Sequence, residues 1–500
     1  MMYNLNESFD SLQFSTLSLS DHQLHKFHYQ TFIDQQQQQQ QSDTPQSTAK
    51  LNIIENLKYI VKILSDDQST FDDVLSSVRL IRKLLSIDND PPIDHILATG
   101  ISPRLIYLLN NSDDNFILQF EISWTLTNLC SGTFEQTQVL VNNNILPVFI
   151  RLLSSPQRDI REQSIWALGN IAGTCVFYRD LSLGNGVLEA LLPLASRELH
   201  HPIYTNNSNN SIINNNSSKS NKSSSIFSWT ITNLIRGSPK PSLYHLKLAT
   251  SILSTIIQEK RESEIPEEEI AQCCWGMSFI TQSDSDEHIQ LVIDANNLPY
   301  LVHLLCHPST KVQYPAVLTI GNISTGNKEQ SLHLSSMPSV IHNLSQLLRS
   351  PESSIRRVAC WTISNLVEDN LMAITQPSCT IIPLMIDMVE NDPSPIVRQE
   401  AGWVISNLIE SNTDLIEEMV NRGCLNSVYK LIYEPDSKSI QLALNIYKQI
   451  FTFLPPDRAE FKQFCKDYQL VTRLRELTSH HPEHEISFLA SNIVNKFLTN

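Results

Sequence analysis

Glycine is scarce in this chain of 500 residues, which contains only 12 of them. Folds that depend on many tight turns or on glycine-rich phosphate loops are therefore disfavoured. The sequence also lacks any stretch of about 18 uncharged apolar residues, the length of a membrane-spanning helix. Its first residues show neither the basic nor the apolar segment of a secretory signal. We therefore expect no signal peptide and no insertion into a membrane.

The sequence also lacks C-x-x-C motifs and an excess of basic residues. The nine cysteines include no C-x-x-C motif, so we expect reduced core residues and no metal site. The formal net charge is −16, which disfavours nucleic acid as a ligand and favours basic partners. Common catalytic motifs, such as a phosphate-binding loop, H-E-x-x-H or G-x-S-x-G, do not occur. We expect neither an enzyme nor a bound cofactor.

Tryptophan, in contrast, follows a regular pattern that includes all six tryptophans of the chain. Five of them begin a block Trp-x-x-x-Asn, and these pairs are Trp124 and Asn128, Trp166 and Asn170, Trp229 and Asn233, Trp361 and Asn365, and Trp403 and Asn407. The sixth, Trp275, is followed by Phe279, and Asn322 ends a block that begins with Leu318. Successive blocks are 42 to 46 residues apart, except that 63 residues separate Trp166 from Trp229. A period of about 40–47 residues is typical of helical armadillo or HEAT repeats.

The residues between the blocks repeat as well. Several blocks follow an apolar helical segment that ends in Leu-Leu and a short polar turn with proline, as in 146–156 and 298–309. The sequence therefore predicts an all-α fold, a right-handed superhelical solenoid of about ten armadillo repeats in residues 51–500, with a concave groove. Residues 1–50 include seven consecutive glutamines, and we expect a disordered tail there. The Asn/Ser-rich stretch 203–225 accounts for the one long interval, and we expect an exposed low-complexity insertion within the fourth repeat.

The repeated tryptophans and asparagines indicate a peptide-binding surface. Residues four positions apart lie on the same face of a helix, so each asparagine is one turn from its tryptophan. A core role is the alternative for any single block, but a core does not need the same aromatic residue in every repeat. An asparagine carboxamide can bond both the N–H and the C=O of an extended peptide. Neighbouring indole rings can hold the methylene stem and the charge of a lysine or arginine.

Several segments of the chain resemble the importin alpha family, adaptors that recognise nuclear localisation signals. The resemblance rests on 167–173 (Ala-Leu-Gly-Asn-Ile-Ala-Gly), on 319–327 and on the Pro91-Pro92-Ile93-Asp94 segment, and it extends over roughly residues 70–500. It implies two peptide sites in the groove. The first site would contain Trp124, Asn128, Gly132, Thr137, Trp166, Asn170, Trp229 and Asn233. The second would contain Asn322, Gly326, Trp361, Asn365, Glu400, Trp403 and Asn407.

This sequence departs from the family pattern mainly in its charged residues. Thr174 stands where the family has the aspartate that binds the key lysine of the first site. In the second site Leu318 replaces an arginine and Val358 replaces a glutamate. In the fifth repeat, Gln272 and Gln282 stand where acidic residues are usual. The asparagines that would hold a peptide backbone therefore match the family pattern more completely than the acidic residues that would select its lysines.

The resemblance also implies partners and a location. The implied partners are cargo proteins with basic nuclear localisation signals, importin beta, and the export factor that recycles the adaptor. The implied location is both cytoplasm and nucleus, between which the adaptor shuttles. The family binds importin beta through a basic N-terminal segment, whereas residues 1–50 here hold only Lys26 and Lys50 as basic residues. The alternative function is an armadillo-repeat scaffold or regulatory peptide-binding protein outside the importin-beta import cycle.

Overall fold

The computed structural model describes residues 57–87, 91–200, 220–259, 265–283, 285–337, 339–376, 379–454 and 459–498. Within these ranges the regular structure is helical throughout and contains no strand, which confirms the predicted all-α class. The expected tail, 1–50, lies outside the described residues. So does 203–219 of the expected insertion, while residues 220–225 lie within a helix that begins at Ser220.

The chain divides into two compact units, residues 1–190 and 191–500. The helices of the first unit are α3 (Leu57–Ser65), α4 (Phe71–Leu85), α5 (Ile93–Leu97), α6 (Ser102–Asn110), α7 (Phe116–Leu129), α8 (Phe134–Asn142), α9 (Ile145–Leu152), α10 (Arg158–Thr174), α11 (Val176–Gly184) and the beginning of α12 (Val187–His200).

The second unit continues the same kind of helix sequence to the C-terminus. Its helices are α13 (Ser220–Ile235), α14 (Leu243–Glu259), α15 (Glu267–Thr281), α16 (Asp286–Asp294), α17 (Leu298–Leu304), α18 (Thr310–Ser324), α19 (Lys328–Ser335), α20 (Val340–Leu347), α21 (Ser353–Leu366), α22 (Leu371–Ile374), α23 (Ile381–Asn391), α24 (Pro395–Ser411), α25 (Leu415–Asn421), α26 (Cys424–Leu431), α27 (Ser437–Phe453), α28 (Ala459–Asp467), α29 (Leu470–His480) and α30 (His484–Phe497).

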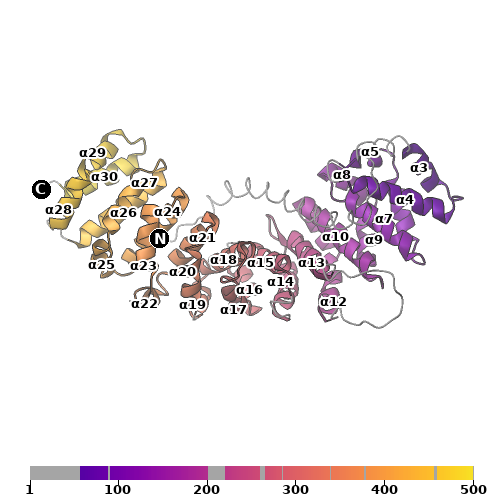
Figure 1. Cartoon of the computed structure of the whole chain (residues 1–500), viewed down its shortest axis with the longest axis horizontal. Coiled ribbons are helices and arrows are strands. Elements are labelled where there is room, and N and C mark those ends of the chain that lie inside the picture. The colour runs from indigo at the N-terminus through magenta and orange to yellow at the C-terminus, as the bar shows by residue number, and fades with distance from the viewer. Residues whose placement is uncertain are drawn as a thin grey trace. The chain divides into compact units, whose positions relative to one another are not determined.

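Most helices fall into sets of three, a short first helix, a second helix and a long third helix, such as α8, α9 and α10 or α16, α17 and α18. The described helices form ten sets, eight of them of three helices, in agreement with the predicted number of repeats; the first set comprises α3 and α4. The fifth set differs, because one helix of 17 residues, α14, precedes its third helix. Within each unit the third helices pack on one another in series, α4, α7 and α10 in the first and α13, α15, α18, α21, α24, α27 and α30 in the second (Figure 1).

Stacking explains why the third helices are buried on nearly every face. In α7 the residues from Glu121 to Leu129 are all buried, including four hydroxyl and amide side chains. The threonine hydroxyls within these helices are satisfied by backbone carbonyls. Thr127 donates to Ser123 O at 2.9 Å within its own helix and lies 3.1 Å from Gln163 O of the next third helix. The Thr127 hydroxyl thus joins two successive repeats, whereas the buried Ser123 Oγ of the same helix has no hydrogen-bond partner among the described residues.

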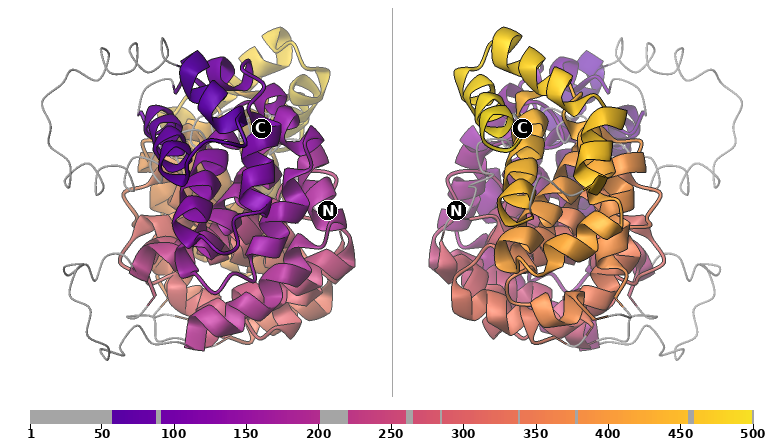
Figure 2. Two further views of the ribbon diagram at one scale, coloured as in Figure 1. Left: turned by 90° about the vertical axis from the view of Figure 1, so that its right-hand side faces the viewer. Right: turned by 90° about the vertical axis from the view of Figure 1, so that its left-hand side faces the viewer.

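Buried arginines fix the turns between second and third helices. Arg356 at the start of α21 makes a bidentate ion pair with Asp392 of the following repeat, at 2.7 and 2.9 Å. A third nitrogen of the same guanidinium donates to the carbonyls of Ser350 and Pro351 in its own turn. Arg398 repeats the arrangement one repeat later with Glu434. The array ends with α28, α29 and α30, which are yellow in Figure 2; α30 packs on α29 and α27.

Candidate peptide-binding site

All of the predicted Trp-x-x-x-Asn blocks lie on third helices. In the first unit α7 carries Trp124 and Asn128, and α10 carries Trp166 and Asn170. In the second unit the other three pairs lie on α13, α21 and α24, while α15 carries Trp275 with Phe279 and α18 carries Leu318 with Asn322. The structure therefore places each tryptophan one helical turn before its asparagine, in equivalent positions of successive repeats.

The asparagine side chains are oriented by the preceding repeat. In the first unit Asn128 Nδ2 donates to Ser86 Oγ at 3.2 Å, and Asn170 Nδ2 donates to Thr127 O at 3.1 Å. Because the nitrogen of each amide is turned toward the neighbouring helix, the orientation of its oxygen is set as well.

The same pattern recurs in the second unit. Asn322 Nδ2 donates to Ser278 O at 3.1 Å, Asn365 Nδ2 to Ser324 Oγ at 3.0 Å, and Asn407 Nδ2 to Ser364 O at 3.0 Å. Among the described residues, the Oδ1 atoms of these three asparagines and of Asn128 and Asn170 accept no hydrogen bond, and none is a buried atom without a partner. They are acceptors in reach of solvent, suited to the N–H groups of an extended chain.

The tryptophans differ in what surrounds them. The guanidinium of Arg82 lies over the Trp124 ring at 4.2 Å from its centroid, and Glu121 holds this arginine by an ion pair. The indole of the first block thus already carries a cation from its own chain, in the geometry expected for a bound basic side chain. Trp361 packs against the backbone of α18, where a Cβ at Gly321 would lie 2.4 Å from the indole. Trp166, Trp229 and Trp403 are half-buried.

The fifth repeat replaces its asparagine by an aromatic cluster. The Trp275 ring lies 5.6 Å from Tyr314 and 5.8 Å from Phe279, between ring centroids. Phe279 offers no side-chain hydrogen bond to a peptide. The array of asparagines is therefore interrupted here, between the two predicted sites.

Gly132 and Gly326 have the same local reason to be glycine. Each precedes the N-cap of a first helix, α8 or α19, that begins with a capping box. The glutamine of that box folds back, so a Cβ at Gly132 would lie 2.2 Å from Gln136 Oε1, and one at Gly326 2.3 Å from Gln330 Oε1. These glycines permit a helix cap; their predicted contact with a ligand lysine stays a prediction.

The charged and hydroxyl residues of the predicted sites are placed as follows. Thr137 is fully buried, and its Oγ1 has no hydrogen-bond partner among the described residues. Thr174 donates its hydroxyl to Asn170 O at 2.9 Å. Glu400 on α24 is half-buried; burial raises the pKa of its carboxyl to about 7, against the opposing effect of Arg357. Val358 is buried and cannot replace the lost acidic group.

The structure also contains a carboxylate that sequence reasoning missed. Asp369 follows the end of α21, and its side chain is only 6% exposed. Ser331 of α19 donates to Asp369 Oδ2 at 2.6 Å. A signal for this group was present, because Asp369 is four positions after Asn365 as Thr174 is four positions after Asn170.

The predicted first site is divided between the two units. Six of its residues, Trp124, Asn128, Gly132, Thr137, Trp166 and Asn170, lie in the first unit, whereas Trp229 and Asn233 lie on α13 in the second. The second predicted site lies within the second unit, on α18, α21, α24 and the turn at Gly326.

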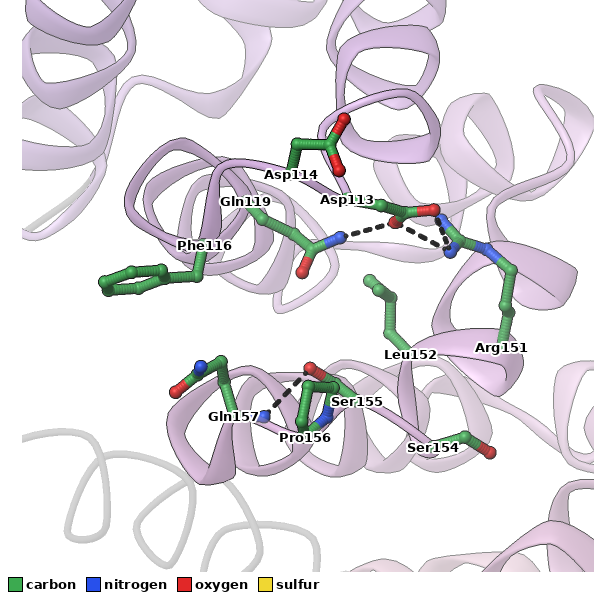
Figure 3. A pocket seen from close by; sticks show the side chains of 10 residues that line it. All are labelled: Asp113, Asp114, Phe116, Gln119, Arg151, Leu152, Ser154, Ser155, Pro156 and Gln157. Atoms are coloured by element: carbon green, nitrogen blue, oxygen red, sulfur yellow. Dashed lines mark hydrogen bonds and ion pairs between the residues drawn. The ribbon is translucent and has the colours of Figure 1, made fainter.

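A separate cavity of about 350 Å³ lies in the first unit between the turns that precede α7 and α10 (Figure 3). Figure 3 shows Asp113 facing Arg151 and Gln119, with which it forms hydrogen bonds of 2.9 and 3.0 Å. Its central charges therefore pair with each other, and none of the predicted peptide-binding residues lines it.

Other kinds of site find no support in the described part of the chain. No group of three or more histidine, cysteine, aspartate or glutamate side chains there is placed to hold a metal ion. No disulfide joins any of the nine cysteines, all of which lie in the described ranges; five are buried, as predicted, but Cys306 is exposed. None of the helices described is long and apolar enough to cross a membrane.

Comparison with known proteins places these features in a family. The model of the armadillo/beta-catenin-like repeat matches residues 89–131, 133–173, 285–325 and 340–368. Importin subunit alpha-1b of Oryza sativa subsp. japonica is 33% identical over 442 residues, which cover 87% of this chain and 77% of that protein. Importin subunit alpha-4 of Arabidopsis thaliana is 31% identical over 466 residues, covering 91% and 81% of the two chains.

The fold also matches a solved structure. The crystal structure of an engineered protein superimposes with a TM-score of 0.71 at 18% sequence identity, covering 89% of this chain and 98% of that one. Together with the repeat matches, this likeness supports the predicted armadillo solenoid.

Proposed function

The chain belongs to the importin alpha family, and we propose that it is a nuclear import adaptor that binds basic nuclear localisation signals of cargo proteins. The observation that carries the proposal is the row of asparagines whose amide nitrogens are fixed by the preceding repeat and whose oxygens face solvent. An adaptor is not an enzyme, in agreement with the lack of catalytic motifs.

The proposed contacts use one type of group for the backbone and another for the side chains. Asparagine oxygens accept the main-chain N–H groups of an extended peptide, whatever its sequence. Indole rings on successive third helices lie beside the lysine or arginine stems and attract their charge. The net charge of −16 raises the encounter rate with basic segments. The residues proposed for these contacts are those predicted for the two sites.

Titration of a fluorescently labelled peptide that carries four consecutive lysines tests this function. We predict that the full chain binds it and that Trp166→Ala weakens binding about fivefold to thirtyfold, since an indole slot contributes about 1–2 kcal/mol. Trp275→Ala is the matched control, because Trp275 is also a half-buried residue of a third helix but lies in the interrupted repeat. Equal effects of both variants, or no binding at micromolar protein, would show that the array does not bind basic peptides.

As an adaptor, the chain would also bind importin beta and the recycling export factor and shuttle between cytoplasm and nucleus. The neutral Thr174 favours a second function, a peptide-binding scaffold outside the import cycle. A pull-down with importin beta separates the two. Capture supports the adaptor, and failure of capture by a chain that binds the peptide supports the scaffold.

A further inference from the structure

The third and seventh repeats, which carry residues of the first and the second predicted site, have equivalent positions that can be compared through the repeat register. The first set is Gly132, Thr137, Asn170 and Thr174. The second set is Gly326, Ser331, Asn365 and Asp369. In both sets the glycine precedes the first helix of a repeat, and a residue with a hydroxyl group follows five positions later. The asparagine lies on the third helix of the same repeat, and the fourth member follows it by four positions. Only the fourth member differs in charge, a neutral threonine in one set and an aspartate in the other.

The contacts of the two sets differ accordingly. In the second set the Ser331 hydroxyl donates to Asp369 Oδ2 at 2.6 Å. In the first set Thr174 turns its hydroxyl back to Asn170 O, at 2.9 Å. The equivalent hydroxyl, on the buried Thr137, then has no partner within the part of the chain that the structure describes. Buried hydroxyls normally have one, so the first set has the structure of a carboxylate pocket whose carboxylate is missing.

The second set already holds an ammonium group. Lys328 Nζ pairs with Asp369 Oδ1 and lies 3.4 Å from Glu368 Oε1. This hydrogen bond to Asp369 raises the pKa of Lys328. The lysine side chain is 58% exposed, whereas the Asp369 side chain is 6% exposed. The ammonium group of an exposed lysine side chain thus pairs with a buried carboxylate. A lysine of a bound peptide would need the same arrangement.

We propose that Asp369 and Ser331, beside the turn at Gly326, form a lysine-selective pocket in the second site, and that Lys328 occupies it until a peptide lysine displaces it. This inference rests on the proposed function, since it assigns the residues that select lysine within the peptide groove. The second site, rather than the first, then supplies the charge selection. Of the two sets, it is the second in which a buried carboxylate, Asp369, accepts a hydrogen bond from the hydroxyl five positions after the glycine.

The four-lysine peptide and a matched peptide with norleucine in place of each lysine are the probes. Asp369→Asn is expected to weaken binding of the lysine peptide about tenfold to a hundredfold and to leave the norleucine peptide unchanged. Glu368→Gln is the control, because it removes the same charge beside Lys328 from a carboxylate that is 82% exposed, and we expect a change of less than about threefold.

Two further variants keep the test decisive if Asp369→Asn lowers stability. Lys328→Met removes the internal competitor and is expected to strengthen binding of the lysine peptide about threefold to tenfold. Thr174→Asp supplies the missing carboxylate next to Thr137 and is expected to increase the preference for lysine over norleucine. Thermal unfolding of each variant shows which of them retain the fold.

The outcomes separate the pocket from the function on which it rests. If the chain binds the lysine peptide and loses it in Trp166→Ala, but Asp369→Asn behaves like Glu368→Gln, the pocket is wrong and the adaptor function stands. An unchanged affinity in both Lys328→Met and Thr174→Asp would overturn the pocket in the same way. If the unaltered chain binds neither peptide, the proposed function fails, and the pocket fails with it.

Discussion

Five asparagines of the array, Asn128, Asn170, Asn322, Asn365 and Asn407, have a structural role that precedes any contact with a ligand. The Nδ2 group of each donates to the third helix of the preceding repeat or to the residue that caps that helix, as Asn170 does to Thr127 and Asn128 to Ser86. The amide is therefore held in one orientation before a peptide arrives. Binding then costs less side-chain entropy than it would with a mobile amide.

The raised pKa of the Glu400 carboxyl leads us to expect that the free energy of unfolding depends on pH. Its pKa is about 7 in the folded chain, above the ordinary value of about 4.3 for an unfolded chain. The folded state therefore binds the proton more tightly, and the cost of burying the charge is absent below the unfolded pKa and complete above pH 7. We predict that Glu400→Gln raises the free energy of unfolding by about 1–3 kcal/mol at pH 8 and leaves it nearly unchanged at pH 4.5.

Urea unfolding at the two pH values measures this difference. Glu410→Gln is the control, because Glu410 lies on the same helix and is exposed. An equal effect of Glu400→Gln at pH 4.5 and pH 8 would contradict the assignment of a raised pKa to Glu400.

At the scale of residues, the sequence predicts where a side chain lies on its helix better than it predicts which side chains it contacts. The tryptophans and asparagines could be assigned to one helix face because the spacing of four residues fixes it. The cation of Arg82 over Trp124 could not be predicted, since it depends on the distance between two repeats. Asp369 was missed because its role is visible only when its hydrogen bond to Ser331 is compared with the unpaired hydroxyl of Thr137.

At the scale of elements, the turns before α21 and α24 are held by largely buried arginines, Arg356 and Arg398. Arg356 and Asp392 have side chains that are 11% and 5% exposed. Removing one member of such a pair leaves a buried charge without its counterion. We predict that Asp392→Ala lowers the free energy of unfolding by about 3–5 kcal/mol.

Denaturant unfolding tests this prediction against an exposed ion pair. Arg422 and Glu418 are half-exposed and four residues apart on one helical segment, so Glu418→Ala should cost at most about 1 kcal/mol. The combined variant Arg356→Met with Asp392→Leu should recover much of the loss, since it leaves no buried charge. A loss from Asp392→Ala no larger than that from Glu418→Ala would contradict the structural role of the pair.

The elements themselves were largely predictable. The apolar period and the proline turns locate the second and third helices, and the ten sets follow from the repeat length. The single long helix α14 was not predicted, because no repeated residue marks the absence of a turn in the fifth repeat. The start of α13 at Ser220 was not predicted either, since the polar composition of 220–225 is typical of a loop.

At the scale of the whole molecule, family membership and the repeat array lead to the same class of function. The relatives match over most of both chains, and the blocks on which the resemblance rests are those that the structure places on successive third helices. The acidic charge of the chain suits basic ligands. What the sequence did not predict is the buried carboxylate of Asp369 beside the second proposed site, because its burial and its contact with Ser331 depend on how the helices pack.

The most direct measurement of the central claim is a crystal structure of the full chain with the four-lysine peptide. We predict an extended peptide along α18, α21 and α24, with main-chain N–H groups about 3 Å from the Oδ1 atoms of Asn322, Asn365 and Asn407. A peptide bound away from these helices, or one whose main chain makes no contact with the three asparagine oxygens, would contradict it.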